Sequence, residues 1–141
     1  MINFIKQILG YPHFIEKDDG YKAWYLNGKL HRTDGPAVEW ADGSKAWYLN
    51  GGRHRTDGPA LEYADGYKAW WSNDKLHRIE GPAIEWADGS KSWWSNGQLH
   101  RTDGPAFERA DGSKSWYLNG VEYKPVNTKI GGIKKKKKKK T

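Results

Sequence analysis

A tryptophan recurs every 23 residues through most of this 141-residue chain. The row consists of Trp24, Trp47, Trp70, Trp93 and Trp116. A histidine recurs at the same interval, at His31, His54, His77 and His100. A fixed period of about 20 to 50 residues is typical of chains that stack one supersecondary unit on the next. The period therefore restricts the fold to a repeat architecture in which each unit packs mainly against its neighbours.

Two turn signals divide each repeat into two strand-like runs. The first is Asn-Gly, as at Asn27-Gly28, and it favours a two-residue hairpin loop because Asn and Gly tolerate positive φ. The third repeat has Asn73-Asp74 at this place. The second signal is Ala-Asp-Gly, as at residues 41–43. These signals predict an all-β fold, an elongated single-layer antiparallel meander of β-hairpin repeats with about nine strands.

We divide the chain into a cap at 1–18, four and a half repeats at 19–123, and a closing segment with a lysine-rich tail at 124–141. The cap is expected to contain a short amphipathic helix and then an extended stretch that covers the first open edge of the sheet. The last strand is short and is followed by Pro125, which cannot donate to a ladder. We therefore expect both edges to be closed to lateral association.

A run of seven lysines in the tail accounts for the whole formal net charge of +7. The run consists of Lys134, Lys135, Lys136, Lys137, Lys138, Lys139 and Lys140. Because the chain has 24 basic and 17 acidic residues, the part without this run is formally neutral. A neutral body argues against a built-in nucleic-acid groove, so nucleic acid is expected as a partner only through the tail. Like charges repel, so we expect a disordered tail, which could tether a polyanion, aid solubility or have no role.

Composition excludes several other classes of site. The chain has no cysteine, so it can form neither disulfides nor thiolate metal sites. Its apolar runs are too short for a transmembrane helix, and the N-terminal stretch is a poor membrane-surface helix.

The Asn27-Gly28 loop predicts the register of the first hairpin. It sets Trp24 opposite His31 and Tyr25 opposite Leu30, so that these two pairs lie on opposite faces of the sheet. Strand alternation then places Arg32 on the Tyr25 face.

The second hairpin has two alternatives. A two-residue loop at 42–43 sets Val38 opposite Trp47 and on the Trp24 face. A three-residue loop that includes Ala41 sets Glu39 opposite Lys45 and moves Val38 to the other face. We favour the first alternative because it gathers the tryptophans and Val38 into one apolar face.

Each of the first four repeats also carries a His-Arg-x-Asp/Glu unit. Its arginines are Arg32, Arg55, Arg78 and Arg101. Imidazoles two strands apart lie about 9 to 10 Å from each other, too far to share one metal ion. We interpret the tryptophans, histidines and arginines as a structural ladder, in which His packs on its cross-strand Trp and Arg pairs with a carboxylate. We expect no catalytic residues, no metal and no cofactor, although the tryptophan row could alternatively stack single-stranded bases.

At this level of detail residues 19–123 resemble the MORN repeat, a hairpin unit with an aromatic strand, Asn-Gly, a histidine and then Asp-Gly. The resemblance is closest to a variant with His-Arg-x-Asp-Gly-Pro-Ala in each unit, found in hypothetical proteins of large tailed phages and giant viruses. The arginines stand where a glycine usually follows the histidine, so a membrane surface is not an expected partner.

The resemblance implies a single-layer ribbon with a scaffold or binding role and no known catalysis. We therefore expect a viral accessory or structural protein that binds a protein partner or itself, in the host cytoplasm or the virion. The alternatives are a nucleic-acid-associated protein held by the tail and an inhibitor of a host protein.

Overall fold

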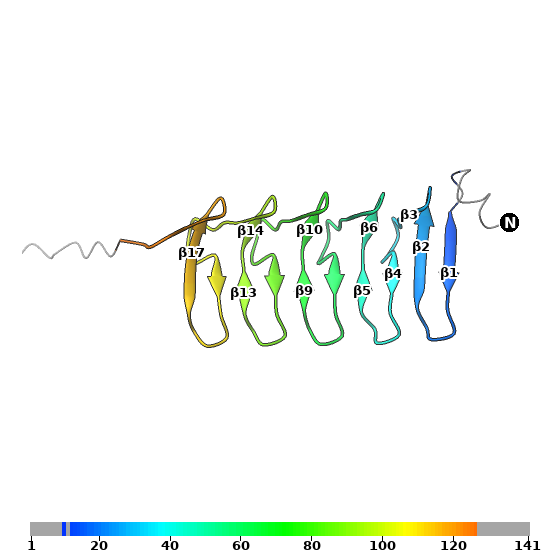
Figure 1. Cartoon of the computed structure of the whole chain (residues 1–141), viewed down its shortest axis with the longest axis horizontal. Helices are drawn as coiled ribbons and strands as arrows, with labels where there is room; N and C mark the ends of the chain where they lie inside the picture. The colour runs from blue at the N-terminus through cyan, green and yellow to red at the C-terminus, as the bar shows by residue number, and fades with distance from the viewer. Residues whose placement is uncertain (1–9, 11, 127–141) are drawn as a thin grey trace, which may run out of the picture.

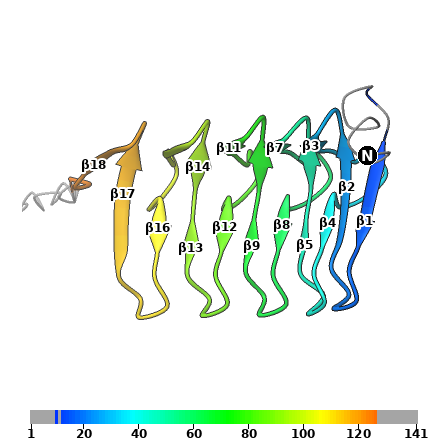
Figure 2. The same ribbon diagram turned by 45° about the vertical axis from the view of Figure 1, so that its right-hand side comes forward.

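The computed structural model describes residues 10 and 12–126. The predicted N-terminal helix and the predicted disordered lysine tail both lie outside these residues. The described part is all-β, and its strands lie side by side in one elongated layer (Figures 1 and 2). This confirms the predicted antiparallel meander of hairpin repeats.

Twelve strands form the main sheet, in the order β1-β2-β4-β5-β8-β9-β12-β13-β16-β17-β18 with β3 paired to β2. Nine of them match the predicted number of strands, while β1 is the extended part of the cap, β3 is the return arm of the first hairpin, and β18 is the expected short last strand. Their bounds are β1 (His13–Glu16), β2 (Lys22–Leu26), β3 (Lys29–Leu30), β4 (Val38–Glu39), β5 (Lys45–Ala46), β8 (Leu61–Glu62), β9 (Lys68–Ala69), β12 (Ile84–Glu85), β13 (Lys91–Ser92), β16 (Phe107–Glu108), β17 (Lys114–Leu118) and β18 (Val121–Tyr123). Three two-stranded hairpins stand beside the sheet, namely β6 (Tyr48–Leu49) with β7 (Gly52–Arg53), β10 (Trp71–Ser72) with β11 (Lys75–Leu76), and β14 (Trp94–Ser95) with β15 (Gln98–Leu99).

The first hairpin has the predicted register. Tyr25 lies opposite Leu30, and the two loop residues Asn27 and Gly28 have φ of 51° and 73°. The returning arm is only two residues long, because after Leu30 the chain turns toward the next repeat. There the Arg32 N–H donates to the carbonyl of Tyr48 at 3.1 Å. Each short arm therefore links one hairpin to the next.

The second hairpin does not have the register that we favoured. Glu39 lies opposite Lys45, and Val38 lies opposite Ala46 instead of Trp47. The loop therefore contains three residues, 41–43, and it is fixed by the Asp42 carboxylate, which accepts a hydrogen bond from the Ser44 N–H at 2.8 Å. An Asx turn followed by a glycine at positive φ is a favourable three-residue hairpin loop, which is the physical reason for the difference.

This register decides which residues share a face. We call the face with Ala23, Val38 and Ala46 the front face, and the face with Trp24 the back face. The prediction that Trp24 and Val38 share one apolar face is therefore wrong. The centre of the front face is the core of the ribbon, formed by the buried residues Val38, Ala46, Leu61, Ala69 and Ile84.

The back face carries a ladder of alternating charges. Lys22 lies opposite Glu39, Glu39 opposite Lys45, and Lys45 opposite Glu62. The alternation continues through Lys68, Glu85, Lys91, Glu108 and Lys114. We call β2, β5, β9, β13 and β17 the Lys strands, and β4, β8, β12 and β16 the Glu strands. Opposite charges on adjacent strands stabilise this register by about 0.2 to 1 kcal/mol per pair.

The two edges of the sheet differ. Strand β1 pairs with β2 from His13 to Glu16, so the extended part of the cap covers the first edge as predicted. At the other edge β18 pairs only with residues 116–118 of β17. Within the described residues no strand lies on the outer side of Lys114 and Ser115. The expectation that the last strand closes this edge is therefore correct for residues 116–118 of β17 and not for Lys114 and Ser115.

Candidate functional site

Each of the first four tryptophans of the row lies beneath an arginine of its own repeat. The arginine Cζ lies 3.8 to 3.9 Å from the ring centroid in the pairs Arg32–Trp24, Arg55–Trp47, Arg78–Trp70 and Arg101–Trp93. Strand alternation had placed Arg32 on the other face, and that prediction is wrong. The chain leaves the sheet after Leu30, so the two-residue alternation ends before Arg32.

The loop after each arginine closes over its guanidinium. In the second repeat Arg55 Nη1 donates to the Pro59 carbonyl at 3.0 Å and to Glu62 at 3.0 Å, and its Nε donates to Asp57 at 2.8 Å. A Cβ on Gly58 would lie 2.9 Å from the Arg55 Cζ, so only glycine fits this approach. The hydrogen bond from Arg55 lowers the pKa of the Asp57 carboxyl. On the back face, each of these tryptophans is therefore covered by the arginine and the loop of its own repeat.

The histidines connect successive repeats. His31 lies opposite Trp24, as predicted, and its N–H donates to the Trp24 carbonyl at 2.9 Å. Its Nδ1 accepts a hydrogen bond from the Asn50 N–H of the next hairpin at 3.0 Å. The same bond recurs at His54, His77 and His100. An accepting Nδ1 places the proton of the neutral ring on Nε2. Within residues 10 and 12–126, no three His, Asp or Glu side chains are grouped to hold a metal ion.

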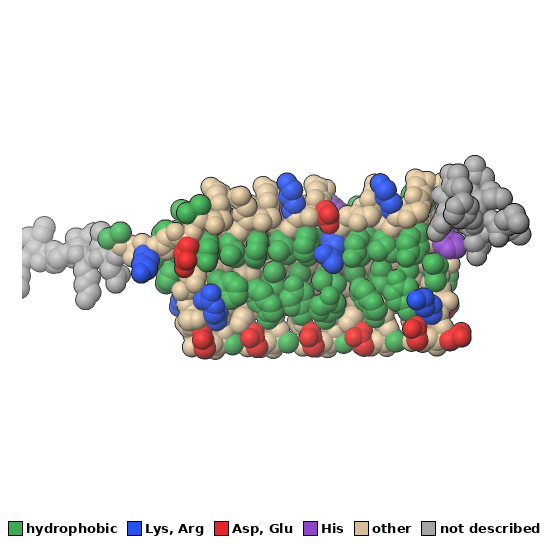
Figure 3. Space-filling model, viewed as in Figure 1, with side chains coloured by type: hydrophobic (Ala, Val, Ile, Leu, Met, Phe, Trp, Pro, Cys, Tyr) green, Lys and Arg blue, Asp and Glu red, His purple; other side chains and the backbone are tan. Residues whose placement is uncertain are grey.

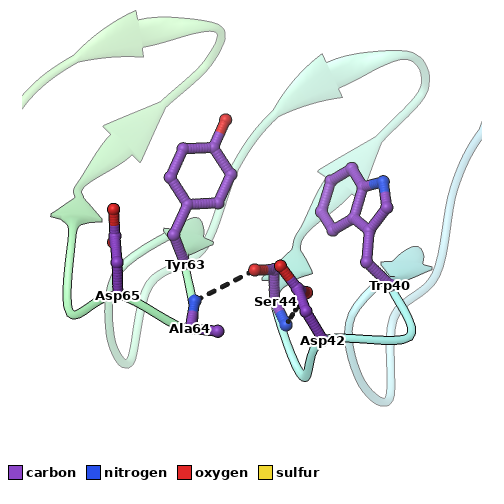
Figure 4. Close-up of a pocket in the computed structure, with 6 residues that line it drawn as sticks. All are labelled: Trp40, Asp42, Ser44, Tyr63, Ala64 and Asp65. Atoms are coloured by element: carbon purple, nitrogen blue, oxygen red, sulfur yellow. Dashed lines mark hydrogen bonds between the residues drawn. The ribbon is translucent and has the colours of Figure 1, made fainter.

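A pocket of about 380 Å³ lies on the front face near the Asp-Gly turns, between Trp40 and Tyr63 (Figure 4). Its polar groups bind one another. The Ser44 hydroxyl accepts a hydrogen bond from the Ala64 N–H at 3.0 Å, and the Ser44 N–H donates to Asp42 at 2.8 Å. These groups support the turns of two successive repeats.

The front face carries large aromatic side chains on both sides of its buried centre. A band of hydrophobic side chains runs along this face (Figure 3). In one row, Tyr63 lies 5.3 Å from Tyr67 and Trp86 lies 5.1 Å from Phe107, measured between ring centroids. Tyr63 is 44% exposed. The sheet is one layer thick, so within the described residues no second layer covers this band.

Arg53 interrupts the band at one point. It stands where three other repeats have Leu30, Leu76 and Leu99. Its Cζ lies 4.9 Å from the Trp71 ring centroid, and no described carboxylate lies within ion-pair distance of it. Its Nε is buried and has no hydrogen-bond partner. Sequence reasoning missed this residue, although its departure from the leucine of the other repeats was a visible signal.

The Trp71 indole N–H is a second unpaired donor beside Arg53. In the next repeat the Trp94 indole N–H donates to the Ser92 hydroxyl at 2.6 Å. Ala69 stands at the place of Ser92 in the repeat of Trp71 and offers no acceptor. Two unpaired donors therefore lie together in the middle of the aromatic face.

No family model matches the chain, and a search of curated proteins gave no match. The described residues contain no helix that is long and apolar enough to span a membrane. The architecture that is established is an antiparallel β-hairpin repeat with a 23-residue period.

Proposed function

We propose that this chain is a non-catalytic repeat scaffold that binds a protein partner through its aromatic front face. The observation that carries the proposal is the uncovered aromatic band with Arg53 inside it. Large exposed apolar patches on a protein surface mark interaction sites. The back face is a weaker candidate, since its tryptophans already lie beneath arginines and its charges pair within the sheet.

The chemistry of the band defines the partner. Its aromatic rings favour apolar and aromatic side chains, which contribute most of the binding free energy at protein interfaces. Arg53 favours a carboxylate, because a guanidinium without an ion partner gains a charge-assisted hydrogen bond on binding. The viral accessory or structural role implied by the MORN-like resemblance is part of this proposal, and an inhibited host protein would be one such partner.

Two lysine substitutions test the face. Tyr63→Lys places a charge on the front face, and Ile79→Lys places the same charge on the back-face loop of the third repeat, where Ile79 is 87% exposed. A partner is first identified by affinity capture with the wild-type chain, and its affinity is then measured with both purified variants. We expect Tyr63→Lys to abolish binding and Ile79→Lys to preserve it. The reverse result would place the interface on the back face.

Arg53→Leu tests the carboxylate. It restores the leucine of the other repeats and should keep the fold, since Leu30 and Leu76 pack against the same core. We expect a tenfold or greater loss of affinity, because an interfacial charge pair contributes about 1.5 kcal/mol or more. Unchanged affinity would show that the partner has no acidic group at this position.

The seven-lysine run favours a second candidate function, which is association with nucleic acid. Neutralising up to seven phosphates should give a slope of log affinity on log salt near −6 on duplex DNA, at about −0.9 per contact. Truncation after Ile133 should remove this binding, because the remaining chain is formally neutral. Equal binding of single strands by the truncated chain would instead assign the binding to aromatic side chains of the ribbon.

A further inference from the structure

Strand β1 stands at one end of the ribbon and presents an edge of its own (Figure 1). It pairs with β2 on one side, and within the described residues no strand pairs with its other side. A free strand edge is a template for pairing with another chain unless it is protected. Lysine and proline are common protecting residues, and His13–Glu16 contains neither. The edge of β1 is therefore a candidate surface for strand pairing.

The backbone groups of Phe14 and Glu16 point to the free side of β1. At the end of the β1–β2 hairpin the Lys17 N–H donates to the Tyr21 carbonyl at 2.9 Å. Hydrogen-bonded pairs alternate with unbonded pairs along an antiparallel ladder. Ile15 therefore bonds inward to β2, whereas Phe14 and Glu16 direct their N–H and C=O groups outward.

The bonds on the other side of β2 agree with this assignment. Trp24 lies opposite Phe14, and its N–H donates away from β1, to the Ala37 carbonyl at 2.8 Å. Trp24 thus uses its backbone groups on the far side of β2 and leaves those of Phe14 without a partner in β2. The Phe14 side chain is also 47% exposed.

We infer that two copies of this chain pair through β1, antiparallel to each other, about a two-fold axis that passes between the two copies of Ile15. Phe14 of each copy lies opposite Glu16 of the other. This register gives a hydrogen-bond partner to the N–H and C=O groups of both residues in both copies. The same surface is used twice, so the contact is isologous and closes as a dimer.

Backbone chemistry and charge select this register over its neighbours. A shift by two residues in one direction would set Glu16 opposite Pro12, which has no N–H to donate to the Glu16 carbonyl. A shift by two in the other direction would set the two Glu16 carboxylates opposite each other, and like charges in that position are destabilising. In the inferred register each Glu16 keeps its ion pair with Lys22 of its own copy, at 3.6 Å.

Side chains of both faces support the junction. Ile15 lies opposite Ala23 on the front face and meets Ile15 of the other copy at the axis. On the back face Phe14, which lies 4.9 Å from Trp24 between ring centroids, packs against the Glu16 methylenes of the other copy. The axis is perpendicular to the sheet, so both front faces lie on the same side of one continuous sheet.

Single cysteines test the axis on the full-length chain, which has no cysteine of its own. The Cα atoms of a non-hydrogen-bonded antiparallel pair lie about 4.5 Å apart, within the range that a disulfide spans. We therefore expect Ile15→Cys to give a disulfide-linked dimer under mild oxidation, seen on a non-reducing gel. Ile79→Cys is the matched control, because Ile79 is 87% exposed but lies in the third repeat. If Ile15→Cys forms a linked dimer no faster than Ile79→Cys, the inference is wrong.

A proline tests the backbone bonds. Glu16→Pro removes an N–H that points outward, so no hydrogen bond within one copy is lost, and proline is tolerated on edge strands. Glu16→Ala removes the same side chain but keeps the N–H. In sedimentation velocity we expect the wild-type chain and Glu16→Ala to be dimers and Glu16→Pro to be a monomer at the same concentration. Circular dichroism checks the fold of Glu16→Pro, and if this variant does not fold, the cysteine pair decides.

Two other outcomes would overturn the inference. A wild-type chain that stays monomeric at every concentration would show that copies do not use this edge. A dimer that survives in folded Glu16→Pro would show that copies meet through another surface. The inference does not depend on the proposed function, which is tested by partner binding to Tyr63→Lys, so the two proposals fail separately.

Discussion

Arg55→Ala should show how much of the stability of the ribbon depends on the arginine on the back face. The Arg55 guanidinium lies 3.8 Å above the Trp47 ring and donates to the part-buried carbonyl of Pro59 at 3.0 Å. Its side chain is only 20% exposed, so solvent screens these contacts weakly. Alanine removes both contacts and leaves the carbonyl without its donor.

The two lost contacts give the expected magnitude. A cation–π contact contributes about 0.5 to 2 kcal/mol, depending on how far the cation is desolvated. A buried acceptor that loses its donor costs about 1 to 3 kcal/mol. We therefore expect Arg55→Ala to lower the free energy of unfolding by about 3 kcal/mol. Arg55→Lys should lose most of this stability as well. The lysine ammonium keeps the positive charge, but it has no planar group that can stack on the Trp47 ring and donate hydrogen bonds at the same time.

Urea unfolding followed by tryptophan fluorescence measures both variants. Asp57→Asn is the matched control, because the carboxylate pairs with the same guanidinium but is 81% exposed. We expect a far smaller effect there, since exposed ion pairs contribute little. If Arg55→Lys unfolds like the wild-type chain, or Asp57→Asn is as destabilising as Arg55→Ala, stacking and the carbonyl bond do not stabilise the repeat as argued.

Three further predictions concern single positions and the repeat as a unit. A Cβ on Gly52 would lie 3.1 Å from the Asp74 Cβ, so Gly52→Lys should destabilise by about 1 to 2 kcal/mol, and Asp74→Gly should restore stability in the double variant. The pKa of Asp34 is lowered by its hydrogen bond from Arg32. The contribution of the ionised carboxylate to stability is therefore present above the unfolded value of 3.8 and is lost as pH falls through the lower folded pKa, so Asp34→Asn should reduce stability at pH 6, and its difference from the wild-type chain should shrink as pH falls below 3.8. Deleting residues 65–87 should leave a shorter cooperative ribbon by circular dichroism, whereas a one-repeat peptide should be unfolded.

The period and the turn residues were sufficient to predict most of the fold. The 23-residue interval gave the repeat, and Asn27-Gly28 gave the register of the first hairpin, because a two-residue loop leaves only one pairing. The extended segment before the first repeat was also recognised as an edge strand. These features depend on local backbone preferences, which the sequence displays directly.

The second register and the functional face could not be predicted in the same way. A three-residue loop shifts the register by one residue relative to a two-residue loop, and such a shift moves every side chain of the strand to the other face of the sheet. The apolar character of the tryptophans favoured the incorrect two-residue loop, because it suggested that they form the core. In the structure they are covered instead by Arg55 and its counterparts. The charge pair between Glu39 and Lys45 favoured the correct loop, and it recurs in each of the four hairpins.

A repeat protein one layer thick must cover both of its faces with its own side chains. On the back face this is done by residues that recur in every full repeat, namely the tryptophan, the arginine and the loop glycine, so these positions are committed to stability. Function then depends on positions where one repeat differs from the others. Such departures lie near the junction of the second and third repeats, where Arg53 and Asp74 replace Leu and Gly of other repeats. Since Arg53 places a guanidinium inside the aromatic band there, beside Trp71, this junction is where we expect a partner to bind the front face.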